Sequence, residues 1–281
     1  MNYTTLISAE TLFPNLDISN WILFDCCFSL ADAEAGAKAY RQGHIANARY
    51  AHLNNDLSSA ATDQTGRHPL PDFALLAKKL GHWGVGNQSQ IIVYDDAGGA
   101  FAGRLWWLLR CMGHERVAVL DGGIKHWQRQ GYPVTTRLPE IKPAPFRAYL
   151  DKNRWLNAAQ VRDGLAAKAI KLIDARTPER YRGEQEPIDP VAGHVPGALN
   201  RPFQLNLNGK GLFLSAEDLR RQFEQLLSGT AADRTVHMCG SGVTACHNLL
   251  AMEHAGLTDS KLYAGSWSDW IRNKNRPVAH D

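Results

Sequence analysis

The residue most suited to covalent chemistry is Cys239, which opens the segment Cys239-Gly240-Ser241-Gly242-Val243-Thr244-Ala245. The run before it, Arg234 to His237, is typical of a strand, and the pattern after it is helical up to a stop at Gly256. The thiol is therefore expected between the carboxyl end of a strand and the start of a helix. Amides at a helix start attract anions, and open α/β sheets bind ligands at this edge. We expect the site to stabilise a thiolate or a persulfide anion.

The glycines around Ser241 strengthen this interpretation. Gly240 and Gly242 permit backbone geometries that are closed to other residues, so successive amides can curl around one sulfur atom. The alternative is a buried cysteine followed by a glycine-rich turn, with Ser241 as an ordinary helix cap. The position of the thiol and the glycine pattern together favour a nucleophilic cysteine.

The other cysteines do not form a metal or disulfide pattern. The chain has five cysteines, an odd number without a zinc-like pair of pairs, and a chain of 281 residues does not need disulfides for stability. Cys246, Cys26 and Cys111 are interpreted as core thiols, and Cys27 is not assigned. We expect reduced thiols and no metal ion.

The two halves of the chain repeat each other. Gly43-His44-Ile45 matches Gly193-His194-Val195, and Ile91 to Tyr94 matches Arg234 to His237. Short apolar runs alternate with helical patterns in each half, which predicts parallel sheets covered by helices. His44 and His194 are interpreted as structural residues that fix a loop after a strand. The fold class is therefore α/β with two duplicated domains.

The halves differ where chemistry is expected. Asp96 of the first half falls opposite Cys239 of the second, each just beyond its strand. Periodicity is lost between Leu138 and Leu150, a proline-rich stretch, and we place the boundary near residue 145. This predicts a first domain over residues 1–140 and a second domain over residues 146–281 that carries the reactive loop.

Composition excludes several classes of function. A formal net charge of +3 is too small to suggest nucleic-acid binding, and apolar runs stop well short of the roughly 20 residues that cross a bilayer. The first residues lack a cationic start followed by an apolar core, so no secretory signal is expected. We expect a cytoplasmic protein without nucleic-acid or membrane partners.

The segment from Cys239 to Ala245, C-G-S-G-V-T-A, resembles the active loop of 3-mercaptopyruvate sulfurtransferases in the rhodanese superfamily. The resemblance covers nearly the whole chain and extends to further segments: Gly43-His44, Gly193-His194, Tyr94-Asp95-Asp96, Arg104-Leu105-Trp106-Trp107, and Asp121-Gly122-Gly123 ahead of Trp127. It implies two rhodanese-like domains, of which the first is inactive and the second catalytic. It also implies that the cysteine passes sulfur from a small-molecule donor to a thiol or cyanide acceptor, with no metal or organic cofactor. A thioredoxin-like protein is one candidate acceptor.

The same resemblance bears on the donor. Loops with cationic side chains after the cysteine are similar to those of thiosulfate users, whereas Gly240, Ser241 and Gly242 are uncharged. This favours 3-mercaptopyruvate, with the backbone of Gly240, Gly242, Val243 and Thr244 facing the substrate. Rhodanese-like phosphatases have a longer loop closed by arginine, so phosphatase activity is disfavoured.

A proton relay is also implied by the resemblance. Ser241 matches the serine of this relay and His68, in Gly66-Arg67-His68-Pro69, matches its histidine. The aspartate falls in His52-Leu53-Asn54-Asn55-Asp56, where the spacing allows Asn54 or Asp56. Asp56 is chosen because only it can ionise. Read alone, His68 would be interpreted as an exposed loop histidine.

Arg180 matches an arginine that holds the carboxylate of the donor through paired hydrogen bonds. The alternative is a surface ion pair with Glu179 or Glu184. A second arginine of the resembled enzymes is absent, because Ile188 occupies its place. Loss of one charged contact weakens binding by about 1.5 to 3 kcal/mol. Two alternatives therefore stay open, a thiosulfate sulfurtransferase and a persulfide carrier that hands sulfur to a protein partner.

Overall fold

The computed structural model describes residues 2–280, which fold into two compact units. Unit 1 comprises the described residues of Met1–Ser59, Leu70–Asp151 and Gly209–Phe213. Unit 2 comprises Ala60–Pro69, Lys152–Asn208 and the described residues of Leu214–Asp281. The predicted segments are 1–140 and 146–281, whereas in the structure Ala60–Pro69 belongs to unit 2 and Gly209–Phe213 to unit 1. The chain passes from unit 1 to unit 2 after Asp151. The predicted domain boundary stays a prediction.

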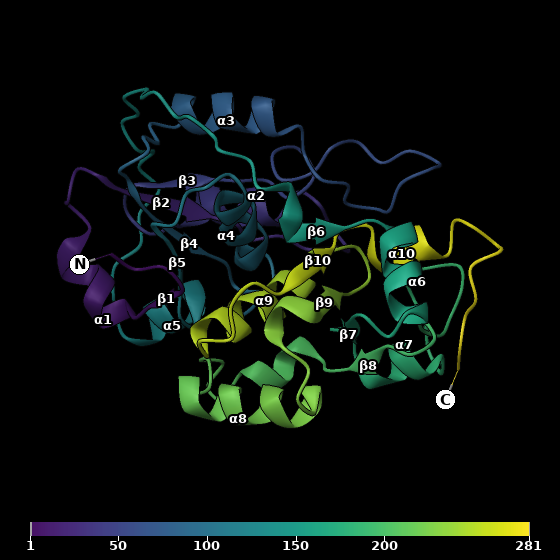
Figure 1. The fold of residues 1–281 in the computed structure, drawn as a ribbon. Coiled ribbons are helices and arrows are strands. Elements are labelled where there is room, and N and C mark those ends of the chain that lie inside the picture. The colour runs from purple at the N-terminus through teal and green to yellow at the C-terminus, as the bar shows by residue number, and fades with distance from the viewer. Residues whose placement is uncertain (1, 281) are drawn as a thin grey trace. The chain divides into compact units, whose positions relative to one another are not determined.

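Among its described residues, unit 1 has a five-stranded parallel sheet in the order β1-β5-β4-β2-β3 (Figure 1). Its strands are β1 (Leu6–Ile7), β2 (Trp21–Asp25), β3 (Ala48–Tyr50), β4 (Gln90–Tyr94) and β5 (Val117–Leu120). Its α-helices are α1 (Ala9–Leu12), α2 (Ala35–Gln42), α3 (Phe73–His82), α4 (Ala102–Cys111) and α5 (Gly123–Arg129), with a 3-10 turn at Phe13–Asn15. The strands read as continuous apolar runs because helices bury both faces of a parallel sheet.

Unit 2 repeats this plan. Its described residues form a five-stranded parallel sheet in the order β6-β10-β9-β7-β8. The strands are β6 (Trp155–Leu156), β7 (Lys171–Asp174), β8 (Leu199–Asn200), β9 (Thr235–Met238) and β10 (Lys261–Tyr263). The α-helices are α6 (Ala158–Ala166), α7 (Pro178–Arg182), α8 (Ala216–Leu227), α9 (Ala245–His254) and α10 (Ser266–Trp270), with 3-10 turns at Lys152–Arg154, Phe203–Asn206 and Ala232–Arg234. The predicted α/β architecture with duplicated, helix-covered parallel sheets is confirmed.

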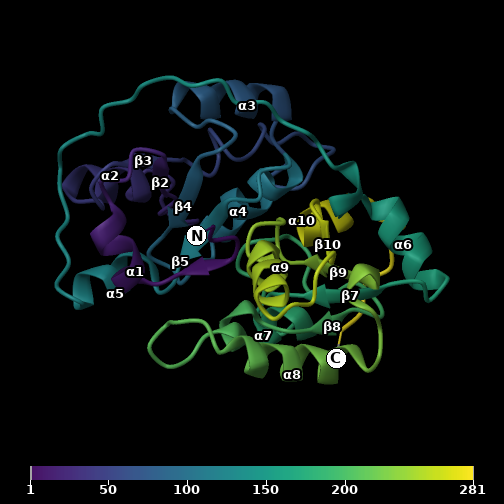
Figure 2. The ribbon, with the colours of Figure 1, turned by 60° about the vertical axis from the view of Figure 1, so that its left-hand side comes forward.

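The central strand β9 faces two different layers. Val236 and Met238 pack into the apolar core that contains Trp267 and Trp270 of α10. His237 points the other way, because side chains alternate along a strand, and contacts Met252 of α9. Helix α8 packs beside α9 (Figure 2). The strand ends at Met238 and therefore places Cys239 at the carboxyl edge of the sheet.

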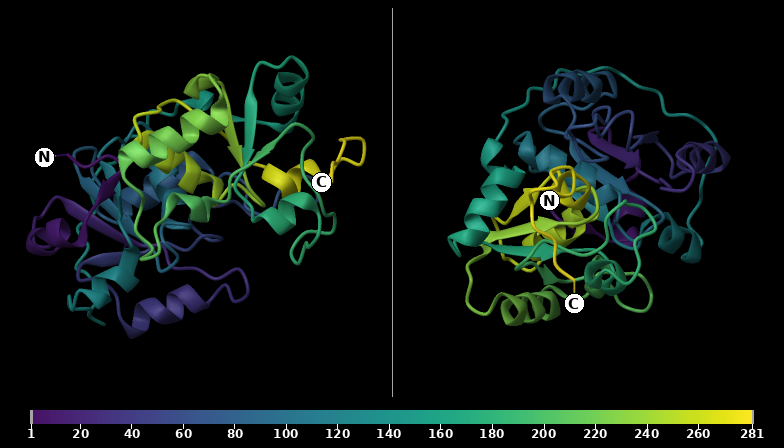
Figure 3. Two further views of the ribbon diagram at one scale, coloured as in Figure 1. Left: turned by 90° about the horizontal axis from the view of Figure 1, so that it is seen from below. Right: turned by 90° about the vertical axis from the view of Figure 1, so that its right-hand side faces the viewer.

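The repeated histidines have equivalent structural contacts. His44 stacks on Tyr40 and its Nδ1 lies 2.7 Å from the Tyr40 carbonyl oxygen. His194 stacks on Tyr181 in the same way, with its Nδ1 2.9 Å from the Tyr181 carbonyl oxygen. The chain end, yellow in Figure 3, turns back after α10, and Ala279 pairs with His194 in an antiparallel bridge. These contacts agree with the structural role expected for both residues.

Candidate active site

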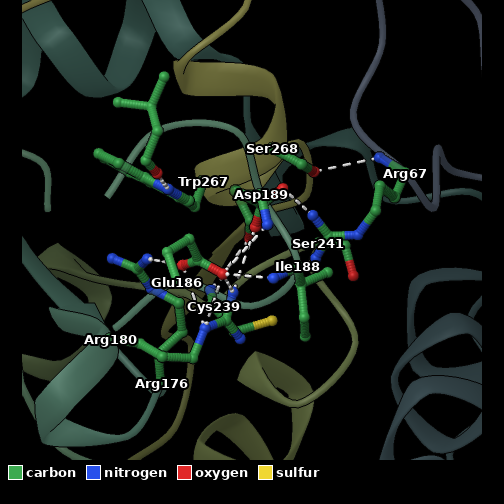
Figure 4. A network of polar contacts seen from close by, with 12 residues as sticks. Arg67, Arg176, Arg180, Glu186, Ile188, Asp189, Cys239, Ser241, Trp267 and Ser268 are labelled. Atoms are coloured by element: carbon green, nitrogen blue, oxygen red, sulfur yellow. Dashed lines mark hydrogen bonds and ion pairs between the residues drawn. The ribbon is translucent and has the colours of Figure 1, made fainter. Parts of the chain in front are cut away.

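The loop after β9 is held by the start of α10. The backbone N–H of Cys239 donates to Ser266 Oγ at 3.0 Å, and the Cys239 carbonyl oxygen accepts from the Trp267 N–H at 3.0 Å. The Gly240 carbonyl oxygen accepts from the Ser268 N–H at 2.9 Å. The backbone on both sides of the reactive position is therefore held by the start of α10. Figure 4 shows Cys239 among the polar side chains that lie around it.

An amide of the loop faces the sulfur atom. The Gly242 N–H donates to Cys239 Sγ at 3.2 Å. Gly242 adopts a positive φ of 78°, and a Cβ atom there would collide with the Ala264 carbonyl oxygen. Glycine is therefore required at this position for both conformation and space. Cys239 is only 2% exposed, so the sulfur is enclosed by the loop and its neighbours.

The remaining loop residues complete the approach to α9. The Val243 carbonyl oxygen accepts from the Cys246 N–H at 3.0 Å, and that of Thr244 accepts from the His247 N–H at 3.1 Å. Thr244 is the N-cap residue of α9. Substrate contacts by the backbone of Gly240, Gly242, Val243 and Thr244 stay a prediction.

The thiols of Cys246, Cys26 and Cys27 are buried in other surroundings than that of Cys239. Cys246 donates through Sγ to the Gly242 carbonyl oxygen at 3.4 Å and is fully buried in α9. Burial raises the pKa of the Cys26 and Cys27 thiols far above the ordinary value, and the nearby Asp25 charge adds to the effect. A thiol held neutral is a weak nucleophile.

Ser241 and His68, far apart in sequence, meet in unit 2. His68 Nδ1 lies 2.7 Å from Ser241 Oγ, and both residues are buried. The segment Ala60–Pro69 is held on unit 2 by two further hydrogen bonds. The Arg67 N–H donates to Ser268 Oγ at 3.1 Å, and Arg272 Nε donates to the Thr65 carbonyl oxygen at 3.2 Å. The structure thus brings together two members of the predicted relay.

Asp56 belongs to unit 1. Its carboxylate accepts from the His52 N–H at 2.7 Å and forms an ion pair with Lys79. The Asn54 N–H donates to His52 Nδ1 at 3.1 Å. The proposed support of His68 by Asp56 or by Asn54 stays a prediction.

Arg180 is held by carboxylates that sequence reasoning did not choose. Its Nη2 donates to Glu186 Oε1 at 2.7 Å and to Asp189 Oδ2 at 3.2 Å, and its Nε donates to both oxygens of Glu186 at 3.1 Å. Glu184, one of the expected partners, is instead bonded by Arg182 Nε at 2.7 Å. The chain after α7 turns inward and buries Glu186 and Asp189, so that proximity in the sequence is a poor guide to ion pairing here.

Two more arginines join this network and were missed by sequence reasoning. Arg176 pairs with Asp174 at 2.7 Å and with Glu186 at 3.3 Å, and its guanidinium lies 4.6 Å from the ring centre of Trp267. Arg67 forms an ion pair with Asp189. Buried carboxylates require cationic partners, but the sequence shows only that acids stand at positions 186 and 189 and not that they are buried.

Two guanidinium groups converge above Gly240. A Cβ atom built at this glycine would lie 2.8 Å from Arg67 Nη2, 3.5 Å from Arg180 Nη2 and 3.6 Å from Arg180 Nη1. Gly240, which follows Cys239, therefore has two guanidinium groups beside it, although the side chains of the loop are uncharged. Guanidinium groups in this position can donate to an anion bound beside Gly240.

Residues 2–280 contain no group of three or more histidine, cysteine or acidic side chains arranged to hold a metal ion. In the same residues, no helix combines the length and apolar character needed to span a membrane. The side chains at the loop offer a thiol, a hydroxyl, an imidazole and guanidinium groups.

Comparison with known proteins places this architecture among sulfur-transfer proteins. Residues 9–130 and 157–273 match the family model of the rhodanese-like domain. A probable 3-mercaptopyruvate sulfurtransferase of Pseudomonas aeruginosa is 45% identical over 281 residues, which are 99% of each chain. The thiosulfate sulfurtransferase of Rattus norvegicus is 34% identical over 84% of this chain and 80% of its own length.

A solved structure supports the same relationship. SseA from Escherichia coli, described with the rhodanese fold and as a 3-mercaptopyruvate sulfotransferase, is 29% identical with a TM-score of 0.81. The match covers 95% of this chain and 100% of SseA. Both the sequence relatives and this structure match the chain across its two repeated halves.

Proposed function

This chain belongs to the family of rhodanese-like domain proteins, and from that premise we propose that it is a sulfurtransferase with Cys239 as its nucleophile. The single observation that carries the proposal is the Gly242 N–H directed at Cys239 Sγ at the start of α9. A backbone donor fixed in this position stabilises the negative charge on a thiolate or on the outer sulfur of a persulfide. The two covalent states of the cycle are both anionic, so one loop serves both.

In the first half-reaction, the Cys239 thiolate attacks the sulfur of 3-mercaptopyruvate. A sulfur–sulfur bond forms, the carbon–sulfur bond breaks, and the enolate of pyruvate leaves and takes up a proton. The enzyme is left as the Cys239 persulfide. Ser241 and His68, 2.7 Å apart, provide a path for the proton between donor and solvent. In this proposal Asp56 supports the charge on His68.

In the second half-reaction, a thiolate or cyanide attacks the outer sulfur. The sulfur–sulfur bond breaks, the Cys239 thiolate leaves, and the acceptor departs as a persulfide or as thiocyanate. A small thiol or a thioredoxin-like protein in the cytoplasm would serve as the acceptor. No metal or organic cofactor enters either step.

The position of the Arg180 guanidinium beside the loop supports 3-mercaptopyruvate as the sulfur donor. Arg180 presents Nη1 near Gly240, where it can donate to the carboxylate of the donor, because Glu186 and Asp189 engage Nε and Nη2. Relatives of both donor classes match the chain, and the relative from Pseudomonas aeruginosa, named for mercaptopyruvate, has the higher identity, 45% against 34% for the rat thiosulfate enzyme. Thiosulfate is the competing donor, because it is also anionic.

The test is a comparison of the two donors with the purified chain and a common thiol acceptor. We expect kcat/KM for 3-mercaptopyruvate to exceed that for thiosulfate by at least about tenfold, as one well-formed charged contact allows. Equal or better use of thiosulfate would defeat the donor assignment. A stable persulfide without multiple turnover on either donor would instead indicate a carrier protein.

A further inference from the structure

Arg67 stands beside the reactive loop of unit 2, although it comes from a segment that interrupts unit 1 in the sequence. Its backbone N–H bonds Ser268, and its Nη2 lies 2.8 Å from the position of a Cβ atom at Gly240. The neighbouring His68 bonds Ser241. One short segment therefore delivers both an imidazole and a guanidinium group to the loop.

Asp189 joins the two arginines of this site. Its Oδ1 accepts from Arg67 Nη1 and its Oδ2 accepts from Arg180 Nη2. The Asp189 side chain is only 3% exposed, so the acid of this bridge is almost excluded from water, whereas the Arg67 side chain is 25% exposed. Such a bridge fixes the spacing between two cationic groups that would otherwise repel each other.

Each guanidinium keeps donors available on the side of Gly240. Within residues 2–280, the hydrogen bonds of Arg67 use its backbone N–H and Nη1, and those of Arg180 use Nε and Nη2. Arg67 Nη2 and Arg180 Nη1 thus remain directed toward the loop. Burial lowers the pKa of Arg67, and the nearby Cys239 charge opposes that effect.

We propose that Arg67 is a donor-binding residue that grips the carboxylate of the sulfur donor together with Arg180 above Gly240. This inference rests on the proposed function, since it assigns a contact to the same substrate. Position 188 carries no charge, and its isoleucine is 42% exposed. The second cation of the site comes instead from the segment Ala60–Pro69.

The competing explanation is that Arg67 only attaches this segment to unit 2. A probe of charge that needs no turnover separates the two explanations. Iodoacetate and iodoacetamide alkylate the same thiol and have nearly the same size, but only iodoacetate carries a carboxylate. The ratio of their rates at Cys239 therefore reports attraction of a carboxylate, independent of how accessible the thiol is.

We expect Arg67→Met to lower the iodoacetate to iodoacetamide ratio at Cys239 by about tenfold, the effect of one charged hydrogen bond. Arg67→Lys should lower it less, because the charge remains and the planar fork is lost. Arg272→Ala is the matched control, since it removes another bond of the same segment. An equal fall in Arg272→Ala would mean that ordering of the segment causes the effect, and this would overturn the proposal.

The variant Arg67→Met/Asp189→Asn removes the cation and the acid together. A ratio that stays low supports direct contact by Arg67, whereas a return to the wild-type ratio would show that the unpaired Asp189 caused the fall. An unchanged ratio in Arg67→Met also overturns the proposal. These readouts use alkylation alone, so they stand even if the wild-type chain forms no persulfide.

With the donor itself, Arg67→Met should raise KM for 3-mercaptopyruvate by about tenfold. Arg272→Ala should leave it within about twofold of the wild-type value, because a surface hydrogen bond contributes little. A normal KM in Arg67→Met, with an active wild-type enzyme, would remove Arg67 from the substrate site and leave the proposed function intact.

Discussion

The loops after β4 in unit 1 and β9 in unit 2 both lead from a strand into a helix, yet they treat negative charge differently. In unit 1, Asp95 Oδ1 accepts from the N–H groups of Ala97 and Gly99, and its Oδ2 accepts from those of Phe101 and Ala102, each at 2.8 Å. The loop amides are thus saturated by a carboxylate of the same chain. The equivalent position in unit 2 is Met238, which is buried in the core.

This difference explains how duplicated domains can diverge in chemistry. In unit 2 an amide of the loop faces Cys239 Sγ, so its donor capacity serves the sulfur. Unit 1 fills its own anion site, and Asp96, the counterpart of Cys239, lies half-exposed near Lys125. One carboxylate therefore turns a potential active loop into a structural one.

The largest expected effect concerns the nucleophile. Cys239→Ser should lower sulfur transfer by at least about 1,000-fold, because an alcohol at this site is a much weaker nucleophile than a thiolate. Cys246→Ser should keep most of the activity. Steady-state assays of both variants check this, and an inactive Cys246→Ser with an active Cys239→Ser would mean that the nucleophile is misassigned.

A second thiol placed in the loop of unit 1 tests the difference between the two loops directly, in the Cys239→Ser variant. Adding Asp96→Cys to Cys239→Ser should not restore transfer, since the amides around position 96 remain bonded to Asp95. Recovered activity would show that a filled amide cradle does not prevent catalysis. Alkylation of the new thiol would confirm that it is accessible in the inactive variant.

Removal of the Asp95 carboxylate tests its structural role. Asp95→Ala should lower the free energy of unfolding by about 3 kcal/mol, because four loop amides lose their acceptor. Urea unfolding followed by hydrogen exchange in peptides of β4 and α4 measures this loss. Asp96→Ala is the matched control, and an equal loss in both variants would contradict the special role of Asp95.

His68 tests the proton path of unit 2. His68→Gln keeps a hydrogen-bonding group near Ser241 but removes the titratable imidazole, so kcat should fall by about 100-fold. The pH dependence of kcat should also lose one ionisation. A variant with an unchanged kcat and pH profile would exclude His68 from proton transfer.

Burial shifts the pKa values of His237 in unit 2 and Asp95 in unit 1 in opposite directions, so the two side chains should affect stability in acid differently. His237 in β9 is fully buried, and burial lowers its pKa to about 3. A histidine with a lowered folded pKa contributes stability that is complete above its unfolded value and is lost as pH falls. In unit 1, burial raises the pKa of Asp95, so this carboxyl group does not add to acid sensitivity.

Because the unfolded chain binds a proton at His237 more readily, the free energy of unfolding of unit 2 should fall by about 2 kcal/mol from pH 7 to pH 5. His237→Asn should remove this part of the pH dependence, whatever it does to stability at pH 7. Urea unfolding at both pH values, with hydrogen exchange in β9 as the local readout, measures the change. An identical pH dependence in the variant would contradict burial of a neutral His237.

The repeat, the parallel sheets and the position of the loop between β9 and α9 could be predicted from the sequence, because each depends on local pattern. The strand before Cys239 and the glycines after it indicate the loop from local sequence alone, whereas residues of α10 hold it in the structure. His68 was found only through family resemblance, since nothing local shows that Ala60–Pro69 packs on unit 2. For the same reason, the position of Arg67 beside Gly240 could not be predicted from the sequence.

The ion pairs of Arg180 could not be predicted for a related reason. Glu179 and Glu184 are nearer in sequence, but pairing at a buried site follows from which acids the chain encloses. Glu186 and Asp189 are enclosed, with side chains only 3% exposed. Burial of several charges together depends on tertiary packing and leaves no periodic signal in the sequence.

The central claim is that unit 2 stabilises a sulfur anion on Cys239 while unit 1 does not. The direct measurement is mass spectrometry of the intact chain and its peptides before and after addition of 3-mercaptopyruvate without an acceptor. The account predicts a gain of one sulfur atom, located on the peptide that contains Cys239 and removed by a thiol. An added sulfur on Cys27 or Cys246, or no added sulfur on Cys239 with either donor, would contradict it.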